Sequence, residues 1–222
     1  MSEYDLFQNL WNTNWYTKNI QIKEIIQAGV LVTDVFGIKG FLNKGDIYFL
    51  WNVGMNLPKG GKYLEVGSWQ GLSSIVVSMG LVSNYNFEGQ VYCVDPWEIM
   101  PEQEMFSKFV QQNDLYQVFC ENIEKTQMKH FIHPLRGKSV EVAEKVNEQF
   151  DVIFIDGEHT FEGCYTDIKA WLPKLKKEGK MFGHDAYPGG GVINALEKIK
   201  SEEGINYKIN EPPFTHYMWE FI

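Results

Sequence analysis

Acidic and imidazole side chains gather in two short stretches of the sequence, each directly after an apolar run. Asp156, Glu158 and His159 follow one run, and His184 and Asp185 follow another. Such groups are costly to hold close together without a cation, a ligand or protonation. Asp156, His184 and Asp185 offer two carboxylates and an imidazole; oxygen ligands suit Mg²⁺, Mn²⁺ or Ca²⁺, and imidazole also admits heavier metals. The pattern therefore predicts an acid–base or divalent-metal site.

A glycine turn at residues 63–74, YLEVGSWQGLSS, is the second chemical signal. It reads as a buried strand that breaks at Gly67 and restarts as a helix, a junction that binds nucleotide-like ligands in open α/β sheets. Dinucleotide folds use G-x-G-x-x-G, whereas the bulky Trp69 stands here in place of the middle glycine and argues against a pyrophosphate. A purely structural turn is the alternative. The residues expected to bind a ligand are Glu65, Gly67, Ser68, Gly71 and Ser73.

Polar residues also end the next two strands predicted along the chain. Asp95 and Trp97 follow the apolar run at 91–94, where a carboxylate can accept hydrogen bonds from ribose hydroxyls. Gly137 and Ser139 follow the third strand; the glycine admits an adenine ring, and the serine hydroxyl either binds the ring or caps the next helix. Helix capping is the alternative for Asp95 as well. In a doubly wound sheet, these strand ends converge.

Strand and helix patterns alternate from Gly60 onward, as a parallel sheet requires. Strands are predicted at residues 62–66, 90–95, 131–135, 151–156 and 180–184. Helices are predicted from about residues 72, 103, 140 and 161, and over residues 192–200. Two more segments, 207–210 and 215–221, predict a hairpin at the sheet edge. We therefore expect an α/β fold with a doubly wound sheet and helices on both faces.

We expect residues 1–58 to form an N-terminal extension and residues 59–222 to form the ligand-binding domain. The extension is rich in aromatic residues, and its clear helical pattern is confined to residues 20–26. Aromatic residues dominate interfaces as well as cores. We expect a lid, an arm or a subunit contact of a homo-oligomer, with simple packing on the sheet as the alternative.

Three stretches carry a family resemblance: DVIFIDGEHTFEG at 151–163, AWLP at 170–173 and GKMFGHD at 179–185. They resemble the class I S-adenosylmethionine-dependent methyltransferases often found in natural-product and sugar-modifying pathways. The glycine turn, read as E-x-G-x-x-x-G, is similar to motif I of these enzymes. The resemblance spans about residues 60–191. It implies a Rossmann-like, seven-stranded and mostly parallel sheet whose last strand runs antiparallel.

The resemblance also implies an O-methyltransferase with a metal. In related catechol-type enzymes, an aspartate ending the fourth strand and an acidic pair ending the fifth bind Mg²⁺. Asp156 matches the first, and His184 with Asp185 takes the place of the pair, although an imidazole departs from the usual carboxylate or amide. His159 matches the position of the general base; a helix-capping or surface imidazole is the alternative.

The same resemblance places S-adenosylmethionine on the ends of the strands. Its methionine part is expected over the glycine turn, its ribose on Asp95 beside Trp97, and its adenine near Gly137 and Ser139. Asp156 is expected to contact the cofactor as well as the metal. The methyl acceptor is expected to be a small-molecule hydroxyl of a sugar, a phenol or a natural product.

Composition narrows the class of protein. The 222 residues carry a formal net charge of −9, which argues against a nucleic-acid partner because phosphates require clustered Lys and Arg. Three cysteines without C-x-x-C spacing argue against a disulfide framework and a zinc site. The N-terminus resembles no secretory signal, and no apolar run reaches the roughly 20 residues of a spanning helix. We expect a cytoplasmic protein that does not bind membranes.

Two other functions stay open at this level. One is a different enzyme on the same cofactor fold, such as a hydroxylase-like relative, since fold does not fix chemistry. The other is a binding protein that keeps the cofactor pocket without turnover. The presence of Asp156, His159 and Asp185 argues against the second.

Overall fold

A computed structural model describes residues 33, 36–98, 114–210, 215 and 217–222. Its centre is a seven-stranded sheet with the order β3-β2-β1-β4-β5-β7-β6. β1 pairs in parallel with β2 and β4, and β3 and β5 extend the parallel sheet on either side. β7 runs antiparallel to both β5 and β6. The predicted Rossmann-like, seven-stranded and mostly parallel sheet is confirmed.

The strands lie close to their predicted positions. Their bounds are β1 Lys62–Val66, β2 Gln90–Asp95, β3 Ile132–Arg136, β4 Phe150–Ile155, β5 Leu175–Gly183, β6 Tyr207–Asn210 and β7 Met218–Phe221. The main difference is β5, which begins at Leu175 instead of residue 180. Its early part carries exposed lysines, and its buried part begins at Met181.

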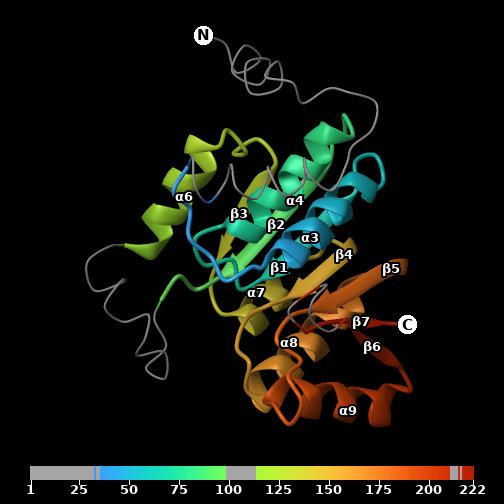
Figure 1. The fold of residues 1–222 in the computed structure, drawn as a ribbon. Coiled ribbons are helices and arrows are strands. Elements are labelled where there is room, and N and C mark those ends of the chain that lie inside the picture. Colours follow the sequence, from blue (N-terminus) through green and yellow to red (C-terminus); the bar gives the residue numbers. More distant parts are fainter. Residues whose placement is uncertain (1–32, 34–35, 99–113, 211–214, 216) are drawn as a thin grey trace.

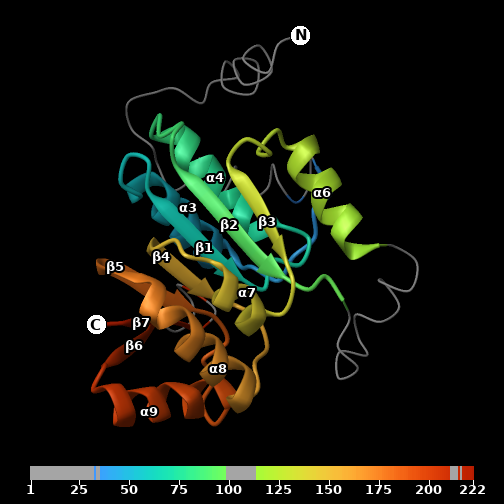
Figure 2. The same cartoon turned by 180° about the vertical axis from the view of Figure 1, so that it is seen from behind.

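Helices cover both faces of the sheet (Figures 1 and 2). One face is covered by α3 Lys44–Asn56, α4 Leu72–Ser83 and α6 Leu115–Lys125, and the other by α7 Ser139–Lys145, α8 Phe161–Trp171 and α9 Gly191–Glu203. A short 3₁₀ turn, Leu172–Lys174, follows α8. The predicted starts near residues 20 and 103 fall outside the described residues. No helix in the described ranges combines the length and apolar character needed to cross a membrane.

Helix α3 was not predicted, and it packs against α4 in the core. Asn43 begins it with a capping box: its side chain accepts hydrogen bonds from the backbone of Gly45 and Asp46, and the Asp46 carboxylate accepts one from the backbone of Asn43. The helix crosses α4 where Gly54 meets Gly80. A β-carbon on either glycine would collide with a carbonyl oxygen of the other helix, so this close crossing requires both glycines.

Candidate active site

Gly67 turns the chain from β1 toward α4 at the centre of the sheet edge. Its φ is +88°, a left-handed conformation that favours glycine. A β-carbon there would collide with the backbone carbonyl of Asp156, at the end of the neighbouring β4. Gly71, also left-handed with φ +87°, then caps α4. The glycine turn is therefore packed directly against the strand end that carries the acidic cluster.

Glu65 anchors this turn from beneath. Its side chain is fully buried, and it accepts hydrogen bonds from Ser73 Oγ at 2.9 Å, Ser74 Oγ at 2.7 Å and the Tyr63 hydroxyl at 3.2 Å. Burial raises the pKa of Glu65 to about 7, against the opposing effect of the serine hydroxyls. Glu65 thus links β1 to the first turn of α4.

Asp95 joins the turn after β1 to the loop after β2. One carboxylate oxygen accepts the backbone N–H of Trp69 at 2.9 Å, and the other accepts that of Trp97 at 2.6 Å. The Trp97 indole N–H donates to the Trp69 carbonyl at 2.8 Å, and its ring packs on Phe119. Burial raises the pKa of Asp95, partly offset by these backbone donors. The carboxylate therefore fixes the two loops on which the cofactor was predicted to lie.

The end of β3 lies next to Asp95. Gly137 donates its backbone N–H to the Asp95 carbonyl at 3.1 Å. Ser139 does not cap α7: the N-cap is Lys138, and the Ser139 hydroxyl instead accepts the indole N–H of Trp171 at 2.9 Å. The capping alternative for Ser139 is wrong. The carboxyl ends of β1, β2 and β3 are thus adjacent, as predicted.

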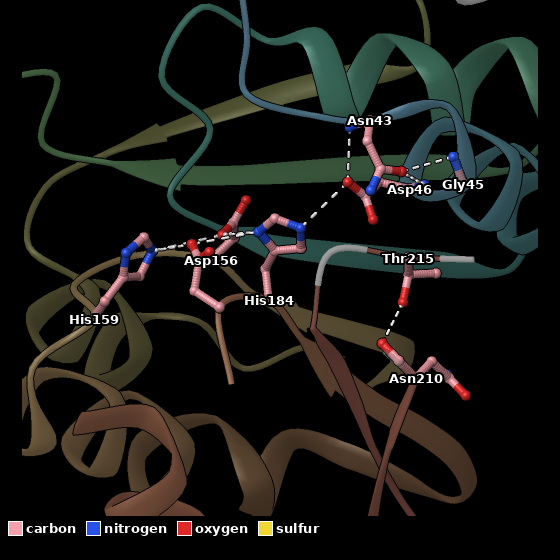
Figure 3. Close-up of polar contacts among 9 residues, drawn as sticks. Asn43, Gly45, Asp46, Asp156, His159, His184, Asn210 and Thr215 are labelled. Carbon is pink, nitrogen blue, oxygen red and sulfur yellow. Dashed lines mark hydrogen bonds and ion pairs between the residues drawn. The ribbon is translucent and has the colours of Figure 1, made fainter. Parts of the chain in front are cut away.

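Asp156, His184 and Asp185 come together where β4 and β5 end. Figure 3 shows Asp156 beside the His184 ring. One ligand atom from each lies within 4.8 Å of the others. His184 Nδ1 is 3.3 Å from Asp185 Oδ2 and 3.7 Å from Asp156 Oδ1. His184 is buried, whereas both aspartates are partly exposed. The three predicted metal ligands therefore form one cluster that opens to solvent on its carboxylate side.

His159 borders the cluster on the exposed side. Its Nε2 is 3.1 Å from Asp185 Oδ2 and 3.7 Å from Asp156 Oδ1, and half of its side chain is exposed. It does not cap α8, because Thr160 is the N-cap and accepts the backbone N–H of Gly163 at 3.0 Å. Burial lowers the pKa of His159, but the two carboxylates outweigh it and leave the pKa above its ordinary value.

A residue that sequence reasoning missed completes the cluster. Asp46, in the first turn of α3, is fully buried, and its Oδ2 lies 3.4 Å from His184 Nε2 (Figure 3). Burial lowers the pKa of His184, but hydrogen bonding with Asp185 and Asp46 and the charge of Asp156 raise it to about 10. The spacing of Asn43 and Asp46 matches a capping box and was the available signal for this helix start.

Comparison with known proteins places this site in a family. Residues 64–186 match the family described as "Methyltransferase domain". The chain belongs to this methyltransferase family. No curated protein matches it at the level of whole sequences.

Solved structures share the fold of this methyltransferase at low sequence identity. An O-methyltransferase from Bacillus cereus in complex with SAH has a TM-score of 0.58 at 15% identity, covering 98% of this chain and 96% of that one. TomG, an O-methyltransferase from Streptomyces achromogenes in complex with SAM, has a TM-score of 0.58 at 10% identity, with coverages of 100% and 98%. Cofactor-bound Rv0187 from MTB has a TM-score of 0.61 at 14% identity, with coverages of 100% and 97%. These similarities confirm the predicted class I methyltransferase fold.

The strand ends of this methyltransferase suit a nucleoside ligand. Backbone N–H groups of Trp69, Trp97 and Ser68 take three of the roughly four acceptor positions of the Asp95 carboxylate. About one position is therefore left for a ribose hydroxyl.

The acidic cluster of the methyltransferase also suits a divalent ion. Metal–ligand bonds of about 2.0–2.2 Å place ligand atoms roughly 3 to 4.4 Å apart. The separations of 3.3 Å and 3.7 Å from His184 Nδ1 to the two carboxylates lie in this range. Two carboxylates with one imidazole favour Mn²⁺ or a heavier divalent metal more than an all-oxygen set does.

Proposed function

We propose that this methyltransferase transfers a methyl group from S-adenosylmethionine to a hydroxyl of a small molecule, assisted by a divalent metal. The observation that carries the proposal is the cluster of Asp156, His159, His184 and Asp185 on the same sheet edge as the glycine turn. Acid and imidazole groups beside the glycine turn suit deprotonation of a hydroxyl. The O-methyltransferases among the similar folds support the same activity.

The proposed cofactor contacts follow the strand ends. Gly67, Ser68 and Gly71 would face the methionine part, with Glu65 and Ser73 holding the turn in shape beneath it. Asp95 would bind the ribose hydroxyls, with Trp97 shaping the loop beside it, and Gly137 with Ser139 would border the adenine. Asp156 would border the cofactor from the β4 side. The cofactor supplies an electrophilic methyl group, and the protein contributes alignment and proximity.

The proposed acid–base chemistry is centred on His159. A proton must leave the acceptor hydroxyl, and a half-exposed imidazole is placed to receive it. Asp185, at 3.1 Å, would hold the ring and stabilise the imidazolium that forms. A divalent ion bound by Asp156, His184 and Asp185 would lower the pKa of the acceptor hydroxyl.

The proposal also covers the role of residues 1–58 and the cellular compartment of the enzyme. α3 packs on α4 and brings Asp46 to the cluster, which supports a role for residues 1–58 in covering the site. The three cysteines are all free, which supports a reducing, cytoplasmic setting.

Formation of S-adenosylhomocysteine tests the function. The purified protein is incubated with S-adenosylmethionine, Mn²⁺ or Mg²⁺, and separate diol, phenol and sugar acceptors, and the products are analysed by mass spectrometry. The proposal expects S-adenosylhomocysteine and a product heavier by one methylene in equal amounts. Prior removal of metal with EDTA should abolish both, and added metal should restore them. Calorimetry that detects no S-adenosylmethionine binding would contradict the proposal, and full turnover after verified metal removal would contradict its metal part.

A further inference from the structure

The two ring nitrogens of His184 face carboxylates on opposite sides. Nδ1 faces Asp156 and Asp185 at 3.7 Å and 3.3 Å, and Nε2 faces Asp46 at 3.4 Å. A ring rotated by 180° would place carbon atoms at both positions and lose every one of these contacts. The arrangement therefore selects one orientation of the imidazole.

Asp46 lies on the far side of the ring from the proposed metal. Its carboxylate cannot reach an ion bound by Nδ1, because the imidazole stands between them (Figure 3). An imidazole that ligates a metal through one nitrogen carries its proton on the other, and a carboxylate on that side holds the tautomer and the ring direction. The geometry of Asp46 matches this outer position.

The carboxylate of Asp46 is itself held in place. It is fully buried in the first turn of α3, and its Oδ2 accepts the backbone N–H of Asn43 at 2.8 Å. The Asn43 side chain in turn accepts the backbone N–H groups of Gly45 and Asp46 at 2.7 Å and 2.9 Å. The same oxygen that closes the capping box faces His184, so the backbone N–H of Asn43, which any residue but proline supplies, holds the carboxylate in place.

We propose that Asp46 is a positioning residue of the metal site: it holds His184 with Nε2–H toward α3 and Nδ1 toward the ion shared with Asp156 and Asp185. This inference rests on the metal-assisted part of the proposed function. It assigns to the N-terminal extension a direct part in metal affinity. It also names Nδ1, and not Nε2, as the ligating atom.

Metal affinity of the full chain tests the role of Asp46. Binding of Mn²⁺ alone is measured by the EPR signal of the free ion for the wild type, Asp46→Asn and Asn43→Ala. Asp46→Asn keeps an oxygen for the capping box but removes the charge facing His184, and should weaken binding 10- to 100-fold. Asn43→Ala removes the side-chain cap but keeps the carboxylate, and should stay within about threefold of the wild type. Equal affinity of the wild type and Asp46→Asn, or an equal loss in both variants, would overturn the proposal.

A second measurement requires no variant. In the Zn²⁺-loaded wild type, long-range ¹H–¹⁵N spectra should show His184 protonated at Nε2 and metal-bound at Nδ1; protonation at Nδ1, or no bound Zn²⁺, would overturn the proposal. S-Adenosylmethionine binding is measured in the same samples by calorimetry. Lost cofactor binding with intact metal binding would count against the proposed transfer reaction alone. Intact cofactor binding with unchanged metal affinity in Asp46→Asn would count against the role of Asp46 alone.

Discussion

Replacing Glu65 with glutamine should stabilise the folded protein at neutral and alkaline pH. Glu65 is fully buried, and its partners are the hydroxyls of Ser73, Ser74 and Tyr63. Glutamine keeps one oxygen for the serines, and its amide N–H can donate to the Tyr63 oxygen. The substitution therefore preserves the contacts and removes only the buried charge.

The magnitude follows from the pKa of Glu65, which burial raises from 4.5 to about 7. Between these values the folded chain binds more protons than the unfolded chain, so stability falls as pH rises. Below pH 4.5 the carboxyl is neutral in both the folded and the unfolded chain, and its burial costs no charge desolvation. Above pH 7 it is charged in both, and the full cost of the buried charge lowers the stability of the folded chain. A shift of this size corresponds to about 3 kcal/mol at pH 8 and about 1 kcal/mol at pH 5.

Urea unfolding followed by circular dichroism from pH 5 to pH 8 measures this difference. Glu65→Gln should exceed the wild type by about 3 kcal/mol at pH 8, and the excess should shrink toward pH 5. Glu88→Gln is the control, because Glu88 is exposed and pairs with Lys59 at the surface, so its replacement should leave the curve close to wild type. A Glu65→Gln variant that is less stable than the wild type at pH 8, or a difference independent of pH, would refute the reasoning.

Three further substitutions test the site. Asp95→Ala should weaken S-adenosylmethionine binding by roughly 1.5 to 3 kcal/mol in calorimetry, the contribution of charged hydrogen bonds, and unchanged affinity would reject the ribose assignment. His159→Ala should lower the transfer rate on the order of 100-fold or more while cofactor affinity stays near that of the wild type; undiminished turnover would mean that another group is the base. Gly67→Ala should destabilise the fold more than Gly189→Ala in urea unfolding. Both glycines have positive φ, but a β-carbon collides with Asp156 only at Gly67, so equal losses would contradict the close packing of the turn.

The sheet was the most predictable part of the molecule. β1, β2 and β6 have their predicted bounds, because short apolar or alternating runs are bordered by glycine, asparagine or aspartate. The predicted strand for β5 began too late, at residue 180, because the preceding residues Lys176 and Lys177 are exposed and show no apolar pattern. Only Leu175 of this early part pairs with β4, and the regular pairing resumes at Lys180, which is where the predicted strand begins.

Helix α3 shows where local pattern fails. Gly45 and Gly54 disfavour a helix, and aromatic residues between them add no strong propensity. Two features outweigh this: the capping box at its start, which is a local signal, and the close crossing of Gly54 with Gly80, which is a tertiary contact. A glycine that weakens an isolated helix is required once two helices meet at this distance.

The sequence predicted three members of the acidic cluster but not the fourth, Asp46. Asp156, His184 and Asp185 end adjacent parallel strands, so the strand order alone brings them together. Asp46 comes from a helix outside the alternating pattern, and no periodicity connects α3 to the end of β5. Sequence spacing predicts contacts within the repeating sheet but not those made by an added element.

The imidazole at His184 and the carboxylate at Asp46 are best understood together. The family resemblance implied an acid or amide at position 184, and an imidazole there gives a bound cation less negative charge than an acid would. Asp46 adds one negative charge on the other side of the His184 ring, with its Oδ2 3.4 Å from Nε2. An extension that acted only as a freely opening lid would carry this charge away from His184. The Gly54–Gly80 crossing and the apolar packing of α3 instead hold the helix against the core, which makes it a fixed wall of the proposed site.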